Sequence, residues 1–108
     1  MNLYESYQET TEDALEGMRR VREVLSGPDR WHKGSVTNED RTKYCIIGAM
    51  SVALLHWRVV DVVGNAIRNC INPDEERVAI SEFNDAPSTT WQDVDQVLDC
   101  ALQKLENA

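Results

Sequence analysis

Residues 44–55 carry the sequence YCIIGAMSVALL, the densest apolar stretch of the chain. Nearly every position is apolar, so the one-sided pattern of a surface helix is lost, which is typical of a helix covered on several sides. Gly48, Ala49 and Ala53 are small and let a neighbouring helix approach closely. The stretch is shorter than the roughly 20 apolar residues of a membrane span. We therefore predict a buried central helix over 44–55.

Helical spacing continues on both sides of this segment. Residues 57–71 place apolar side chains at three- and four-residue steps and predict a helix, although four valines within 59–63 leave a strand over 58–64 as an open alternative. Before the central segment, Thr10 or Thr11 can cap a helix that ends at Ser26-Gly27-Pro28, where glycine suits the helix end and proline cannot continue it. Residues 1–9 are then expected to be a loose or short helical lead-in.

Two more helices are expected in the C-terminal third. Asn72-Pro73, followed by acids, has the features of a helix start, and this short helix is predicted to run to Phe83 before residues 84–88 break it. The last helix opens at Thr90, with Asp93 three residues later as in a capping box. The sequence thus predicts an all-α fold, a compact orthogonal bundle of about five helices, in a single domain over residues 1–108.

The charge of the chain is unevenly distributed. The formal net charge is −8; residues 1–18 carry five acids and no base, residues 72–108 nine acids and two bases, and residues 19–71 nine bases and five acids. Because a net-acidic domain repels phosphate backbones, we expect no direct nucleic-acid binding, and a protein with a basic surface as the partner. The polar, acidic N-terminus does not resemble a secretory signal, so we expect a cytoplasmic protein without a membrane contact.

The three cysteines, Cys45, Cys70 and Cys100, form no CxxC pair, which excludes a zinc ribbon or a thioredoxin-like motif. Each lies in an apolar neighbourhood, so we expect three reduced, buried thiols. No spacing such as HExxH or a glycine-rich phosphate loop is present, and we expect neither a metal nor a cofactor.

Residues 27–43 form the longest stretch without periodicity, and a loop of this length is usually packed down or functional. Trp31, His32 and Lys33 in its middle are candidates for a recognition loop, because aromatic and cationic residues are favoured at interface anchors. The alternative is that Trp31 anchors the loop to the core. Trp91, at the start of the last helix, would mark a partner surface if it is exposed, or would pack against the preceding turn.

Cys45 is the sharpest candidate for chemistry, because the start of a helix lowers the pKa of a thiol. With His32 as a base and Asn84 or Asp85 to orient it, a cysteine-nucleophile site can be drawn. His56 is too far away, about three helical turns or ~16 Å along a continuous helix. The structural interpretation is that Cys45 packs against the turn at Asn84 and Asp85, whose side chains bond backbone groups there.

Two segments carry a resemblance. One is Trp31 to Gly34 followed by YCIIGAM at residues 44–50, and the other is ISEFNDAPSTTWQDV at residues 80–94. Together they resemble a family of small uncharacterised bacterial and phage proteins, a domain of unknown function that pairs W-x-x-G…W-C-x-x-G-A-L with W-N-D-x-P-x-x-T-x-x-E-V. The departures are chemically mild: Tyr44 and Phe83 stand where tryptophan is usual. The resemblance implies no activity, only that the two segments belong to one structural unit.

We therefore predict a small, acidic, cytoplasmic binding or regulatory protein that acts through protein contacts and is encoded by a phage or prophage, rather than an enzyme. Two alternatives stay open. One is a cysteine-dependent enzyme built on Cys45, His32 and Asn84 or Asp85. The other is a structural homo-oligomer with Trp57 and the valine-rich helix as its interface.

Overall fold

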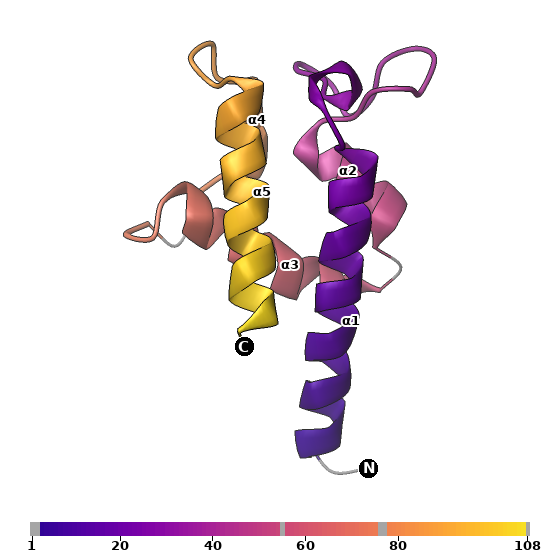
Figure 1. Ribbon diagram of the computed structural model, residues 1–108, viewed down its shortest axis with the longest axis vertical. Coiled ribbons are helices and arrows are strands. Elements are labelled where there is room, and N and C mark those ends of the chain that lie inside the picture. Colours follow the sequence, from indigo (N-terminus) through magenta and orange to yellow (C-terminus); the bar gives the residue numbers. More distant parts are fainter. Residues whose placement is uncertain (1–2, 55, 76–77, 108) are drawn as a thin grey trace.

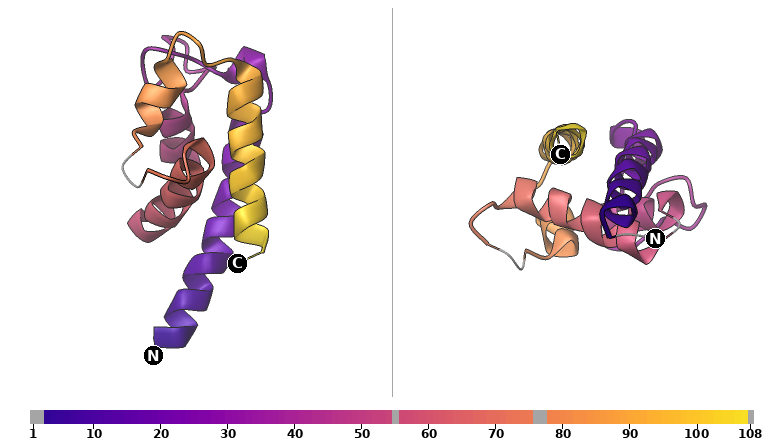
Figure 2. Two further views of the ribbon diagram at one scale, coloured as in Figure 1. Left: turned by 90° about the vertical axis from the view of Figure 1, so that its left-hand side faces the viewer. Right: turned by 90° about the horizontal axis from the view of Figure 1, so that it is seen from below.

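The computed structural model describes residues 3–54, 56–75 and 78–107, and this part of the chain forms five α-helices and one short 3₁₀ helix. Helices α1 and α5 run antiparallel, and α3 crosses behind both of them (Figure 1). The view turned by 90° shows two layers, with α1 and α5 in one and α2, α3 and α4 in the other (Figure 2). The predicted all-α class is confirmed. The elements are α1 (Leu3–Val24), η1 (Pro28–Arg30), α2 (Ile46–Ala53), α3 (Trp57–Ile71), α4 (Ile80–Asp85) and α5 (Trp91–Glu106).

The core lies between the two layers, and α3 contributes to it along its length. Val63 and Ile67 of α3 are fully buried, together with Met18 of α1 and Leu98 of α5. Each such side chain contributes roughly 1.5–3 kcal/mol when removed from water. The alternative of a strand over 58–64 is wrong: burying one face of a helix outweighs the preference of valine for strands. Among the helices described, none has both the length and the apolar character needed to cross a membrane.

The first helix starts earlier than its sequence indicates. It begins at Leu3, so Thr10 and Thr11 lie inside it and are not its caps. Neither glycine nor proline occurs between Leu3 and Gly17, so no breaker stops the helix from extending toward the N-terminus. The N-terminal turns of α1 project past the end of α5 (Figures 1 and 2). Residues 3–9 thus take the helical form of the expected lead-in, continuous with the rest of α1, and residues 1–2 lie outside the described part.

The expected helix start at Asn72-Pro73 is also wrong. Asn72 ends α3, since its N–H donates to the carbonyl of Arg68, and its side-chain oxygen accepts from the N–H of Asp74 at 3.1 Å. The same amide chemistry that caps a helix here forms an Asx turn. Helix α4 begins only at Ile80 and ends at Asp85, so Asn84 and Asp85 still belong to the helix and the expected break falls at residues 86–88.

The start of α5 is as expected. Thr90 accepts from the N–H of Asp93 at 3.3 Å, and the Asp93 carboxylate accepts from the N–H of Thr90 at 2.9 Å. This reciprocal pair is the predicted capping box. It fixes the point at which the chain turns from α4 into α5.

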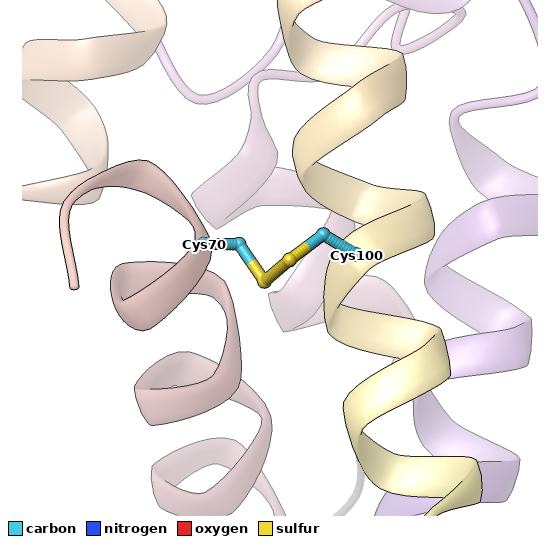
Figure 3. The surroundings of a disulfide bond; sticks show 2 residues. All are labelled: Cys70 and Cys100. Carbon is cyan, nitrogen blue, oxygen red and sulfur yellow. A yellow bond between two sulfur atoms is a disulfide. The ribbon is translucent and has the colours of Figure 1, made fainter.

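The expectation of three reduced thiols is wrong for two of them. Cys70, in the last turn of α3, and Cys100, in the middle of α5, form a disulfide with their Cα atoms 5.9 Å apart (Figure 3). The free thiol is that of Cys45, which is buried as expected. The pairing depends on how α3 and α5 are aligned against each other, and no local pattern in the sequence carries that information.

Gly48 of α2 is required by the loop that packs on it. A Cβ atom at this position would collide with the backbone carbonyl of Val36, and the same carbonyl accepts from the N–H of Cys45 at 3.1 Å. We expect Gly48→Ala to lower the free energy of unfolding by about 2 kcal/mol in urea denaturation, because backbone cannot move aside as a side chain can.

Gly64 in the middle of α3 is the matched control. A Cβ atom there meets only the flexible end of Arg68, at 3.1 Å. Gly64→Ala should be neutral or stabilising by up to about 1 kcal/mol, since alanine favours helices over glycine. Equal losses in the two variants would contradict the assignment of Gly48 to this contact.

Candidate functional site

The loop before α2 and the turn between α4 and α5 lie together at one end of the bundle (Figures 1 and 2). We call their contact the Asn84 joint, formed by residues 31–34, 44–48 and 84–86. The joint brings together the two segments that carry the resemblance. It contains most of the site residues predicted from the sequence.

Asn84 is the centre of the joint and is fully buried. Its Oδ1 accepts from Trp31 Nε1 at 2.8 Å and from the N–H of Ile46 at 3.0 Å. Its Nδ2 donates to the carbonyl of His32 at 3.0 Å and to Asp85 Oδ1 at 2.9 Å. All four hydrogen-bonding positions of the amide are therefore used. Because Ile46 N–H is a free amide at the start of α2, Asn84 also caps that helix.

The predicted binding residues of the loop are tied into this joint. Trp31 is half-buried, and its ring centroid lies 6.3 Å from that of Trp91, tilted by 48°. The Lys33 ammonium lies 5.2 Å from the Trp31 ring centroid and donates to the carbonyl of Ala86 at 2.7 Å. The structure thus supports the interpretation of Trp31 as an anchor of the loop. The His32 ring is turned to Ser35 Oγ, 2.8 Å from its Nε2.

Cys45 acts as the N-cap of α2, and its sulfur accepts from the N–H of Gly48 at 3.3 Å. The thiol is buried, with 6% of the residue exposed. Cys45 precedes Ile46, whose N–H is capped by Asn84. The described hydrogen bonds join the Cys45 sulfur to Gly48 and the His32 ring to Ser35, and not the two side chains to each other. The cysteine-nucleophile site therefore stays a prediction. Among the described residues, no group of three or more His, Cys, Asp or Glu is placed to hold a metal ion.

Asp85 links the turn after α4 to the loop on the exposed side of the joint. Its Oδ1 accepts from the N–H of Gly34 at 2.9 Å, and this backbone bond is the main cause that lowers the pKa of the carboxyl below 3.8. The hydrogen bond from Asn84 lowers the pKa further, burial raises it by less, and the charges of Lys33 and His32 lower it by smaller amounts still. Gly34 has a positive φ of 91°, which glycine adopts without strain.

A carboxyl whose pKa is lowered by folding stabilises the protein above its unfolded pKa, and this stabilisation is lost as pH falls through the folded pKa. We therefore expect Asp85→Asn to reduce stability at neutral pH, with a difference from the wild type that shrinks as pH falls below 3.8. Urea denaturation across this range measures the difference. Asp40→Asn, in the exposed part of the same loop, is the control. A difference that does not vary with pH would contradict the role of the ionised carboxylate.

A second surface lies away from the joint, at the start of α3. Trp57 is the first residue of α3 and is 69% exposed, and Val60, one turn later, is 38% exposed. The His56 ring stacks on the Trp57 ring at 5.9 Å, and the Arg58 guanidinium lies 5.3 Å from the Trp57 centroid. His56 Nδ1 also accepts from the N–H of Arg58 at 3.1 Å, which caps α3. The local helix cap thus holds the neighbours of the exposed ring in place.

A groove of about 290 Å³ lies next to this helix start. Its residues come from α1, the end of α2, the start of α3 and the turn between them, and the groove carries both charges, with Glu16 and Arg20 paired at 3.6 Å. We call the groove and residues 56–60 together the Trp57 surface. From the sequence, Trp57 was expected at an oligomer interface but not at a binding site. The groove is lined by Asp13, Glu16, Gly17, Arg20, Ala53, Leu54, His56 and Val59.

Comparison with known proteins gives one match. A family model described as a family of unknown function matches residues 9–104, a span that contains both the Asn84 joint and the Trp57 surface. No curated protein and no solved structure matches the chain. The expected membership of an uncharacterised family is therefore confirmed.

Proposed function

We propose, from the premise that the chain belongs to the family of unknown function DUF6197, that it is a binding protein whose Trp57 surface contacts a partner protein. The family supplies no activity, so the proposal is carried by one observation: the 69% exposure of Trp57. Scattered apolar residues are normal on a protein surface, but an exposed tryptophan beside a groove is a candidate anchor for an interface.

The surroundings of Trp57 favour binding. Its ring already lies against His56 and Arg58, so fixing it in a complex costs less conformational entropy than fixing a free side chain. Tryptophan and arginine are the residues most enriched among those that dominate interface energies. Val60 extends the apolar area by one helical turn.

The overall charge of the chain favours a basic partner. Near Trp57 the acids Asp13 and Glu16 are balanced by Arg20 and Arg58, but the chain as a whole carries a net charge of −8. A lysine or arginine of the partner can lie with its methylene groups on the apolar floor and its charge near Asp13. Such a complex weakens as salt rises. A cytoplasmic location and a phage or prophage origin are part of this proposal, and the origin rests on the motif resemblance.

Trp57→Ala tests the proposal directly. A display library of random peptides, selected on the immobilised protein, should enrich peptides that combine lysine or arginine with apolar residues. Trp57→Ala should weaken their binding by ~30-fold, equivalent to the loss of about 2 kcal/mol at an interface anchor. The free energy of unfolding should change by no more than about 0.5 kcal/mol, because the ring is exposed. Isothermal titration and urea denaturation measure the two quantities.

Val36→Ala is the matched control, since Val36 is also exposed, at 53%, but lies in the loop before α2. Asp13→Asn with Glu16→Gln should weaken binding and flatten its salt dependence. Enrichment of acidic peptides, or binding that survives Trp57→Ala, would contradict the proposal. Light scattering that shows self-association abolished by Trp57→Ala would instead support the homo-oligomer with Trp57 in its interface.

A further inference from the structure

A second feature of α3 lies at the other end of that helix, where the Cys70–Cys100 disulfide joins it to α5 (Figure 3). Both cysteines are half-buried, and they line a surface hollow of about 340 Å³ together with Phe83, Asp93, Gln96 and Val97. The third cysteine, Cys45, is buried and lies in the Asn84 joint. The chain therefore holds one cystine at its surface and one protected thiol.

The helices joined by the disulfide do not depend on it alone for their contact. Val63 and Ile67 of α3 and Leu98 and Ala101 of α5 are fully buried in the same core. Since these apolar contacts are independent of the oxidation state of sulfur, the bond can open while the bundle keeps its fold.

We propose that the Cys70–Cys100 disulfide is a site of thiol–disulfide exchange with a dithiol protein, a reductant with two neighbouring cysteines. Exchange requires an accessible sulfur and a leaving thiolate that is not strongly disfavoured. The hollow supplies the access, and the side chains of Phe83 and Val97 give it apolar walls against which the partner can pack. Asp93, the charged residue of the hollow, is already engaged in the capping box with Thr90.

The position of each cysteine on its helix decides which sulfur is attacked. Cys70 lies in the last turn of α3, where the helix dipole disfavours a thiolate, whereas Cys100 lies in the middle of α5. Cys100 is therefore the better leaving group, and the partner thiolate attacks Cys70.

The step balances in atoms and electrons. The partner thiolate forms a bond to the sulfur of Cys70, and the Cys70–Cys100 bond breaks with its electron pair on Cys100, which takes up a proton. The second thiol of the partner then loses its proton and attacks the partner's first sulfur, and the mixed disulfide breaks with its electron pair on Cys70, which takes up the proton released when the partner's first thiol ionised. Two electrons and two protons pass to the cystine, and the dithiol partner becomes a disulfide.

The experiment uses the full chain and a thioredoxin-type protein whose second active-site cysteine is replaced by serine, so that the mixed disulfide is trapped. Peptide mass spectrometry should find the adduct on Cys70. With dithiothreitol as the reductant, the native protein should be reduced within roughly tenfold of the rate in denaturant, since the bond is accessible. Circular dichroism should show that the reduced protein keeps its helices.

Cys45→Ser should leave the reduction unchanged, and Cys70→Ser with Cys100→Ser should abolish the adduct. Three outcomes would overturn the proposal: native reduction slower by more than roughly a thousandfold than in denaturant, which indicates a shielded structural bond; loss of the helices on reduction; or a protein that keeps three alkylatable thiols in oxidised glutathione. Trp57→Ala affects none of these readouts, so this proposal and the proposed binding function succeed or fail separately.

Discussion

Asn84→Ala should lower the free energy of unfolding by roughly 3 kcal/mol or more. The change removes four hydrogen bonds at a fully buried residue, and the amide of Ile46 and the indole N–H of Trp31 lose their acceptor. A buried polar group left without a partner costs about 1–3 kcal/mol. Thermal unfolding should show a midpoint lower by roughly 12–20 °C. No other single side chain described in the joint makes as many bonds between distant segments.

Asn84→Asp separates the loss of donors from the loss of shape. This variant keeps an acceptor for Trp31 and Ile46, but it places a second carboxylate against Asp85 Oδ1, where the wild-type amide donates at 2.9 Å. Like charges at this distance raise the pKa of the new carboxyl above its unfolded value. Its stability is then highest below the unfolded pKa and is lost as pH rises through the folded pKa. The variant should therefore gain stability relative to the wild type as pH falls.

Asn65→Ala is the control for both variants. Asn65 is exposed on α3, where its side-chain oxygen accepts from Arg68 at 3.2 Å. Its removal should change the free energy of unfolding by less than about 0.5 kcal/mol. If Asn84→Ala were equally mild, the joint would not be what fixes the loop against α4.

The second large effect is expected from removing the disulfide. Cys70 and Cys100 are 30 residues apart, and in the chain-entropy account a link that closes a loop of this size contributes about 3–4 kcal/mol by restricting the unfolded chain. In urea denaturation, the free energy of unfolding of the double variant, Cys70→Ser with Cys100→Ser, should be lower by this amount. The wild type measured in excess reductant should match the double variant.

The comparison with reductant is the control in this case, because the double variant retains no bond to reduce. A wild-type protein whose stability is the same with and without reductant would show that the link contributes nothing.

The helices with local signals were predictable. The three- and four-residue spacing gave α3 its bounds of Trp57–Ile71, and the pair of Thr90 and Asp93 gave the start of α5, because each signal lies within a few residues of the feature that it determines. The predicted helix start at Asn72 is wrong because an asparagine side chain can form an Asx turn as well as a helix cap. Only the path of the following backbone decides between the two.

The site required information that no short segment contains. The resemblance correctly joined the loop and the turn in one unit, and Asn84 bonds backbone groups as expected, but those of His32 and Ile46, 52 and 38 residues away. The cystine depends on the alignment of α3 with α5. The exposure of Trp57 depends on which face of α3 meets the core, a choice made by Val63 and Ile67.

The distance between Asn84 and Ile46 along the chain also bears on how the protein is made. During synthesis α2 leaves the ribosome before its cap exists, since the capping amide is encoded 38 residues later. The N-terminal half therefore cannot reach its final structure before Asn84 has been made, and the loop before α2 closes only after α4 has emerged. A nascent chain halted before residue 84 carries exposed core residues of α1, α2 and α3, and so becomes a substrate for chaperones and proteases.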